Sequence, residues 1–77
     1  MKSNKEYESL GEFLLDFRKS KAMTQAQFAE KIGINRARYT QIENNKLKVG
    51  VATIASIATF TKKSTSFINS LNEKNRK

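Results

Sequence analysis

The chain has 77 residues, a formal net charge of +8, no cysteine and no histidine. A chain this short favours one marginally stable domain, and the missing residue types exclude disulfides, thiolate metal sites and histidine-based zinc sites or general bases. Because the seven acidic residues are scattered and no cluster of lysines or tyrosines suggests a catalytic site, we expect neither an enzyme nor a bound metal or cofactor.

The first two predicted helices each begin with a capping-box pattern, in which Ser or Thr is followed three residues later by Glu or Gln. Ser9 begins the first helix, expected over residues 9–21, and Thr24 begins the second, expected over residues 24–32. Apolar residues recur at helical spacing along both, and no alternating segment predicts a strand. The side chains expected to face the core are Leu10, Phe13, Leu14, Phe17, Phe28, Ala29 and Ile32.

A third helix is expected over residues 35–44. Gly33 stands where a left-handed residue typically ends a helix, and Asn35 is a favourable N-cap for the next one. A connection of about two residues forces a sharp turn between two packed helices, which is the helix-turn-helix arrangement. Tyr39 and Ile42 are spaced by three residues and would anchor the third helix in the core.

The outward face of this third helix is short, polar and basic, and it would carry Arg36, Ala37, Thr40 and Gln41. A helix that enters the DNA major groove presents such residues from its N-terminal half. Arg can bond guanine bidentately, Gln can bond adenine, and a methyl group can contact thymine. Positive charge at a helix N-terminus is unfavourable unless an anion lies beyond it, as DNA phosphates would.

The positive charge is concentrated around this helix. Residues 1–30 carry five basic and five acidic residues, whereas residues 31–63 carry seven basic residues and a single acid, Glu43. A basic half on a small domain suggests a polyanionic partner. A solvated lysine-rich surface would account for this composition equally well.

Two further helices complete the pattern. A fourth is expected over residues 51–61 and a fifth over residues 65–72, with Ser64 as the N-cap of the fifth. The apolar side chains expected to be buried are Val51, Ile54, Ile57 and Ala58 in the fourth helix and Phe67, Ile68 and Leu71 in the fifth.

The predicted architecture is therefore an all-α, compact five-helix bundle over residues 9–72. Residues 1–8 would form an N-terminal extension, and residues 73–77 a basic C-terminal tail that is frayed. The chain contains no apolar run of the roughly 18 residues that a membrane-spanning helix needs, and its first residues lack the apolar segment of a signal peptide. We expect a cytoplasmic protein that does not associate with membranes.

The stretch from Leu10 to about Ile68 resembles the XRE-type, or Cro and phage-repressor-like, helix-turn-helix family. The most specific part is "MTQAQFAEKIGI" followed by "IENNK". The sequence departs from the family pattern at Asn45, where glycine is common, and at residues 48–50 and 61–63, which replace Asn-Pro-Ser and Leu-Gly-Val. The resemblance implies a five-helix domain that binds operator DNA as a dimer and usually represses transcription.

The resemblance also implies roles for individual residues. Bases would be read by Arg36, Ala37 and Gln41, with Thr40 beside them, and Arg18 and Glu43 would form a partly buried ion pair. Phosphates would be contacted by Gln25, Arg38, Asn44, Asn45 and Lys46. We place the dimer contact at Phe60, Phe67, Ile68 and Leu71, although Phe67 and Leu71 fit the monomer core equally well.

The sequence thus predicts a sequence-specific, double-stranded DNA-binding regulator that acts as a repressor and binds an inverted repeat as a homodimer. Because no effector domain accompanies the predicted bundle, we expect no small-molecule ligand. Two alternatives share the fold, namely an antitoxin-like autorepressor and a restriction–modification controller. A helical module that binds RNA or protein is a third alternative from another class.

Overall fold

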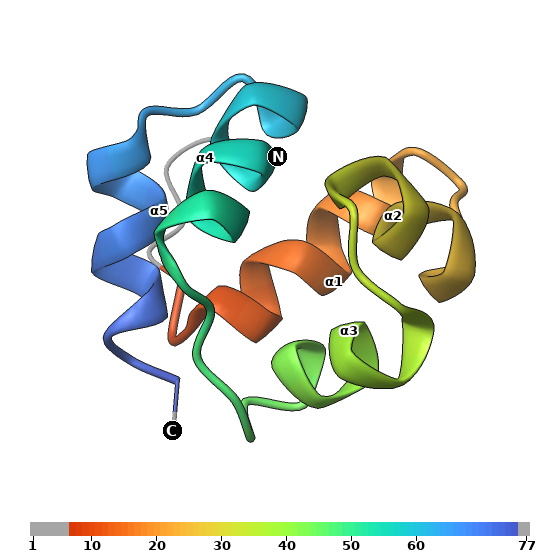
Figure 1. The fold of residues 1–77 in the computed structure, drawn as a ribbon, viewed down its shortest axis with the longest axis horizontal. Coiled ribbons are helices and arrows are strands. Elements are labelled where there is room, and N and C mark those ends of the chain that lie inside the picture. Colours follow the sequence, from red (N-terminus) through yellow and green to blue (C-terminus); the bar gives the residue numbers. More distant parts are fainter. Residues whose placement is uncertain (1–6, 76–77) are drawn as a thin grey trace.

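The structure is a computed structural model in which residues 7–75 are described. Its elements are α1 (Leu10–Ser20), α2 (Gln25–Ile32), α3 (Arg36–Glu43), α4 (Val51–Thr61) and α5 (Thr65–Asn72), and the described residues form no strand (Figure 1). Each helix lies within one residue, at either end, of the range expected from the sequence. The prediction of an all-α five-helix bundle is confirmed.

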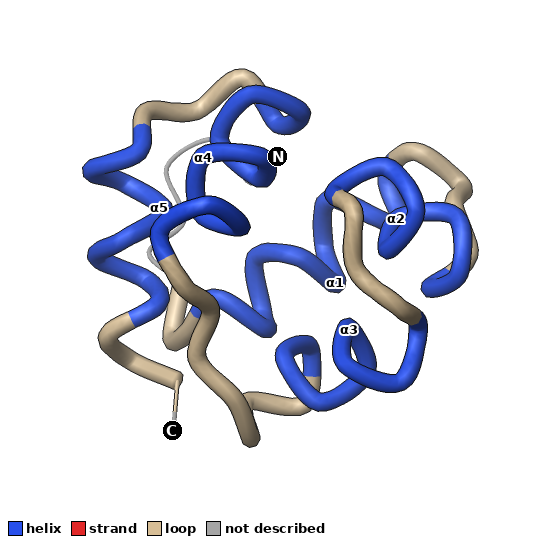
Figure 2. Tube along the Cα trace, viewed as in Figure 1, coloured by secondary structure: helices blue, strands red, loops and turns tan. Residues whose placement is uncertain are grey.

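Helix α1 lies between two pairs of helices. Figure 2 shows α2 and α3 on one side of it and α4 and α5 on the other, and α2 also packs against α4. The core between them is formed by Leu10, Phe13, Leu14, Phe28, Ala29, Ile32, Tyr39, Ile42, Val49, Ile54, Ile57, Ala58, Ile68 and Leu71. Burying this apolar surface is the main favourable contribution to folding a domain of this size.

The helix starts are the ones that the capping residues indicate. At four of the five helices the side chain of the N-cap accepts a hydrogen bond from the backbone N–H three residues later, and these N-caps are Ser9, Thr24, Asn35 and Ser64. The N-cap of α4 is Gly50, which has no side chain to do so. The capping box at Thr24 is complete, because Gln27 bonds back to the backbone of Thr24. At α1 the carboxylate of Glu12 accepts a hydrogen bond from the backbone N–H of Glu8, the residue before the N-cap, at 2.6 Å.

Several helices end in a left-handed residue. Gly33, with φ of 79°, ends α2 as expected, and Asn45, with φ of 66°, follows α3. Lys62 adopts the same conformation, with φ of 62°, after α4. Asn tolerates this region better than Lys does, so the conformation of Lys62 is a local strain.

Two expectations about the fold were wrong. Val51 is 85% exposed rather than buried, because it lies in the first turn of α4 and the core position there is occupied by Val49. Val49 precedes the N-cap of α4 by one residue, and Ile54 is the fourth residue of that helix. Both are buried, as in a hydrophobic staple. Asn72 holds Val49 in place by bonding to its backbone N–H and C=O at 2.9 and 3.0 Å.

The second error concerns the C-terminal tail, which was expected to be frayed. Asn75 is 3% exposed, and its amide nitrogen donates to the carbonyls of Ile42 and Leu47 at 3.1 and 2.9 Å. Its side-chain oxygen accepts from the backbone N–H of Gly11 at 3.3 Å. Residues 73–75 therefore belong to the packed domain, and residues 76–77 lie outside the described part of the chain.

The start of α1 lies directly against the end of α3. A Cβ atom at Gly11 would overlap the backbone carbonyls of Ile42 and Glu43 and the side-chain oxygen of Asn45. The hydroxyl of Ser9 donates to that same oxygen of Asn45 at 2.5 Å. Backbone contact at this point requires the absence of a side chain, and it sets the position of α3 relative to α1.

Candidate nucleic-acid interface

One face of α3 is anchored in the core. Its buried side chains are those of Tyr39, Ile42 and Glu43, and the Tyr39 ring stacks on Phe28 of α2 with centroids 5.2 Å apart. The turn after α2 is tied back to that helix by backbone hydrogen bonds. The N–H of Gly33 donates to the carbonyls of Ala29 and Glu30, and the N–H of Ile34 donates to the carbonyl of Ala29. The turn and the buried face together set the orientation of α3.

The opposite face of α3 is exposed to solvent. Because an α-helix turns by about 100° per residue, Ala37 and Gln41 lie opposite the buried side chains, with Arg36 on one flank and Arg38 on the other. All four residues are exposed. The geometry places Ala37 and Gln41 at the centre of the outward face of α3, with the expected reader Arg36 at one edge of this face and Arg38 at the other.

Glu43 is the centre of a hydrogen-bonded cluster beneath this surface. Arg18 binds its carboxylate bidentately, with Nε to Oε2 at 2.9 Å and Nη2 to Oε1 at 3.1 Å, as the expected ion pair requires. The hydroxyl of Tyr39 donates to Oε2 at 2.7 Å, and Nε2 of Gln25 donates to Oε1 at 2.8 Å. Each carboxylate oxygen therefore accepts two hydrogen bonds, from donors on α1, α2 and α3.

The hydrogen bonds and burial in this cluster shift the pKa values of Glu43 and Tyr39. Burial raises the pKa of Glu43, but the hydrogen bonds from Arg18, Tyr39 and Gln25 outweigh it, and the net pKa is lowered. Burial and the hydrogen bond to Glu43 raise the pKa of the Tyr39 hydroxyl well above its ordinary value. Glu43 is therefore ionised and Tyr39 neutral around pH 7. The buried charge of Glu43 is compensated by Arg18, so it adds little repulsion toward an anion at the surface of α3.

Two of the predicted site residues are bonded to each other. Thr40, expected beside the base readers, donates its hydroxyl to Oε1 of Gln25 at 3.0 Å, and both side chains are partly buried. Gln25, expected to contact phosphate, is thus held by Glu43 and Thr40 at the first residue of α2. Sequence reasoning missed this role, although the i, i+4 spacing of Tyr39 and Glu43 was a signal that a polar cluster forms there.

The residues expected to contact phosphate after α3 differ in their exposure. Asn44 and Lys46 are exposed, and the backbone N–H of Lys46 donates to Gln41 O at 2.9 Å. Asn45 is half-buried, and its side chain is bonded to Ser9. Asn44 and Lys46 therefore present exposed side chains at the end of α3, whereas the side chain of Asn45 is bonded to Ser9, next to the start of α1.

A family model described as helix-turn-helix matches residues 14–68 of the chain. This protein belongs to the XRE-type helix-turn-helix family. The matched range contains the turn at Gly33 and all of α3, and it covers more than half of the chain. No curated protein and no solved structure gives a significant match.

As a member of this XRE-type family, the protein is a DNA-binding transcriptional regulator, and the family is typically non-enzymatic. Within residues 7–75, no helix is both long enough and apolar enough to cross a membrane. Of the four residues placed at a dimer contact, Ile68 and Leu71 are buried in the monomer core, which removes them from that surface. Phe60 and Phe67 are half-buried and pack against the core.

Proposed function

We propose that this protein represses transcription by binding an inverted repeat in duplex DNA as a homodimer, with α3 of each protomer in the major groove. The observation that carries the proposal is the exposed row of Arg36, Ala37 and Gln41 on a helix whose other face is fixed by Tyr39 and Glu43. A recognition surface must be held rigidly to distinguish bases, because its hydrogen bonds depend on side-chain position.

The proposed contacts divide into two kinds. Arg36, Ala37 and Gln41 read base edges, with Thr40 beside them, and they determine which sequence is bound. The phosphates are contacted by Arg38, Asn44 and Lys46, with Gln25 and Asn45 near them. These contacts fix the register of the protein on the DNA. The lysine and arginine contacts release counterions, so binding weakens as the salt concentration rises.

A homodimer is favoured because one short recognition helix offers few base contacts. We locate the contact at a groove of about 370 Å³ between the first turns of α4 and α5, where Val51 is 85% exposed. The residues that line it carry no charge, and they are Val51, Ile54, Ala55, Thr65, Ser66 and Asn69. Two chains of net charge +8 meet with least repulsion at an uncharged surface. This contact replaces the one expected around Ile68 and Leu71.

Selection of binding sites from a random duplex DNA pool tests the proposal. We expect an inverted repeat whose half-sites are about 34–36 Å apart, centre to centre. The double variant Arg36→Ala/Gln41→Ala is the matched control, because both residues are exposed and the core is unchanged. A single unpaired half-site would contradict dimeric binding. Equal affinity for a structured RNA and for the selected duplex would instead favour a general nucleic-acid-binding module.

A further inference from the structure

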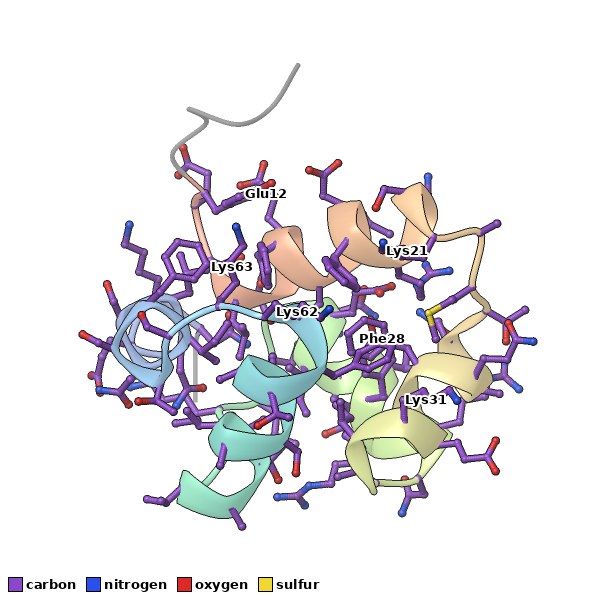
Figure 3. The ribbon with its side chains drawn as sticks, turned by 90° about the horizontal axis from the view of Figure 1, so that it is seen from above. Glu12, Lys21, Phe28, Lys31, Lys62 and Lys63 are labelled. Carbon is purple, nitrogen blue, oxygen red and sulfur yellow. The ribbon has the colours of Figure 1, made fainter. Side chains whose placement is uncertain are left out.

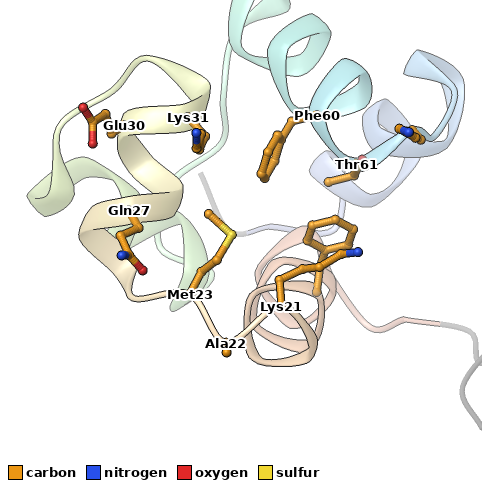
Figure 4. Close-up of a pocket in the computed structure, with 10 residues that line it drawn as sticks. Lys21, Ala22, Met23, Gln27, Glu30, Lys31, Phe60 and Thr61 are labelled. Atoms are coloured by element: carbon orange, nitrogen blue, oxygen red, sulfur yellow. The ribbon is translucent and has the colours of Figure 1, made fainter.

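A second surface lies away from α3. A groove of about 800 Å³ opens between the end of α1, the outer side of α2 and the end of α4 (Figure 4). Phe17, Met23 and Phe60 provide its apolar part, and all three are half-buried. The Phe17 and Phe60 rings meet edge to face with centroids 5.9 Å apart. Apolar side chains that remain partly exposed in a concave surface are typical of a binding site.

The rim of this groove is basic. Lys21, Lys31 and Lys62 come from three different segments, and Figure 3 looks onto them from above, around the buried Phe28. Glu30 is the acid that lines the groove, and no ion pair with these three lysines is present in residues 7–75. The ammonium group of Lys21 lies 5.7 Å from the centroid of the Phe17 ring, so positive charge is held over the apolar part.

We propose that this groove binds an acidic segment of a partner protein. An aromatic or branched aliphatic side chain of that segment packs against Phe17 and Phe60, and its carboxylates pair with the surrounding lysines. Because Lys21, Lys31 and Lys62 are spread around the rim, several carboxylates on one chain match them better than a single carboxylate on a small amphiphile does. The groove is lined by residues of α1, α2, α4 and the segments that follow α1 and α4, and by none of α3, so a DNA-bound protomer can hold this partner.

The charge of the groove disfavours a second copy of this chain as its occupant. Another protomer carries a net charge of +8, and three lysines at the rim would repel it. Phe60, which we expected from the sequence to be a dimer contact, is for this reason assigned to partner binding instead. Lys62 also keeps a left-handed backbone conformation that glycine would adopt without strain, which is compatible with a role for its side chain.

Three fluorescein-labelled nonapeptides test the proposal by fluorescence anisotropy with the full chain. The first has four Asp residues around a central Phe, the second has Ser in place of Phe, and the third has Asn in place of Asp. We expect the first to bind about tenfold more tightly than either other peptide, because it alone combines both interactions. Lys21→Gln, Lys31→Gln and Lys62→Gln should each weaken it by about two- to fivefold, as exposed ion pairs do.

Lys63→Gln is the matched control, since Lys63 is exposed, adjacent to Lys62 and outside the groove. It should change the affinity by less than about twofold. The methyl resonance of Met23, identified through Met23→Leu, should shift when the first peptide is added. A duplex of unrelated sequence should not displace the peptide, and the groove variants should bind selected DNA normally, so this test is separate from that of DNA binding.

Several outcomes would overturn the proposal. Equal affinity for the Phe and Ser peptides, together with an unshifted Met23 methyl resonance, would mean that the peptides bind only by general charge attraction. Displacement by duplex DNA would place the peptide on the DNA-binding face. Binding of dodecanoate but none of the peptides would assign the groove to a small amphiphile. Sedimentation equilibrium measures whether Lys62→Gln changes the self-association of the chain. Such a change would make the groove an interface between copies of the chain.

Discussion

Arg18 and Glu43 join the end of α1 to the end of α3 through two hydrogen bonds of 2.9 and 3.1 Å, and the Glu43 side chain is 5% exposed. The third guanidinium nitrogen, Nη1, donates to the carbonyl of Met23 at 2.9 Å. The pair therefore connects α1, the loop before α2 and α3. It lies beneath the proposed recognition surface and contributes to the position of α3 rather than to base contact.

Replacing Glu43 should destabilise the fold. Glu43→Ala leaves Arg18, Tyr39 and Gln25 without their common acceptor in a buried site, and we expect a loss of roughly 3–5 kcal/mol in the free energy of unfolding. Urea denaturation monitored by circular dichroism measures this change. Among molecules that remain folded, base preference should be that of the wild type. An unchanged melting temperature would contradict the structural role of Glu43.

The lowered pKa of Glu43 predicts how stability depends on pH. The unfolded chain titrates near the ordinary value for Glu, about 4.3, and the folded chain titrates below it. Between these two values the unfolded chain binds more protons, so stability rises with pH there. The contribution of Glu43 is fully present above about pH 5 and is lost as the pH falls through the folded pKa.

The comparison of wild type with Glu43→Gln isolates this effect, because the other carboxyl groups are common to both. Stability measured by urea denaturation at several pH values should fall more steeply in acid for the wild type. The difference in slope can reach about 1.4 kcal/mol per pH unit, which is the limit for one proton. Parallel curves for the two proteins would show that Glu43 does not titrate differently in the folded state.

The contact at Gly11 gives a third prediction. Gly11→Ala should lower the free energy of unfolding by about 1–3 kcal/mol, because the new methyl group overlaps backbone carbonyls that cannot rotate away. Gly50→Ala is the matched control, since a Cβ there meets no atom within 4 Å and its φ is −86°. It should change stability by less than about 1 kcal/mol. Thermal melts of both variants make the comparison, and equal effects would contradict the close approach of α1 and α3.

The local parts of this fold were predictable from the sequence, and the long-range polar contacts were not. Ser9, Thr24, Asn35 and Ser64 act on backbone groups three residues away, so their effect is visible in a short window of sequence. The position of Asn75 depends on its contact with Gly11, which is 64 residues earlier. No local pattern carries that information.

The candidate site shows the same division. The exposed face of α3 follows from helical periodicity, which places Ala37 and Gln41 away from Tyr39. The error at Val51 arose because periodicity gives the direction of a side chain but not whether the core extends to the first turn of α4. The bond between Thr40 and Gln25 depends on how α2 crosses α3, and it therefore appears only in three dimensions.

Asn75 provides a fourth prediction. Asn75→Ala leaves the carbonyls of Ile42 and Leu47 and the N–H of Gly11 without this partner, and it should cost roughly 1–3 kcal/mol of stability. Lys74→Ala at the exposed neighbouring position serves as the control and should have a smaller effect. Amide hydrogen exchange at Gly11 should become faster in Asn75→Ala. Exchange at the wild-type rate would show that this hydrogen bond contributes no protection.

Arg36 and Lys46 should respond differently when DNA binding is measured. Arg36→Ala should weaken binding to the selected operator by roughly 1–3 kcal/mol and relax the preference at one base position, because Arg36 is assigned to base readout. Lys46→Ala should weaken binding to all sequences to a similar extent, since a phosphate contact carries no sequence information. It should also reduce the dependence of log K on log salt concentration by about one unit.

Titrations of both variants against operator and scrambled duplexes, each at several salt concentrations, separate the two roles. The Arg36 variant should lose more affinity for the operator than for the scrambled duplex, and the Lys46 variant should lose the same for both. Equal losses for the Arg36 variant would make Arg36 a phosphate contact. Ala37 and Gln41 would then be the residues of α3 that read bases. The positive charge of Arg36 would contribute only to attraction to the DNA backbone.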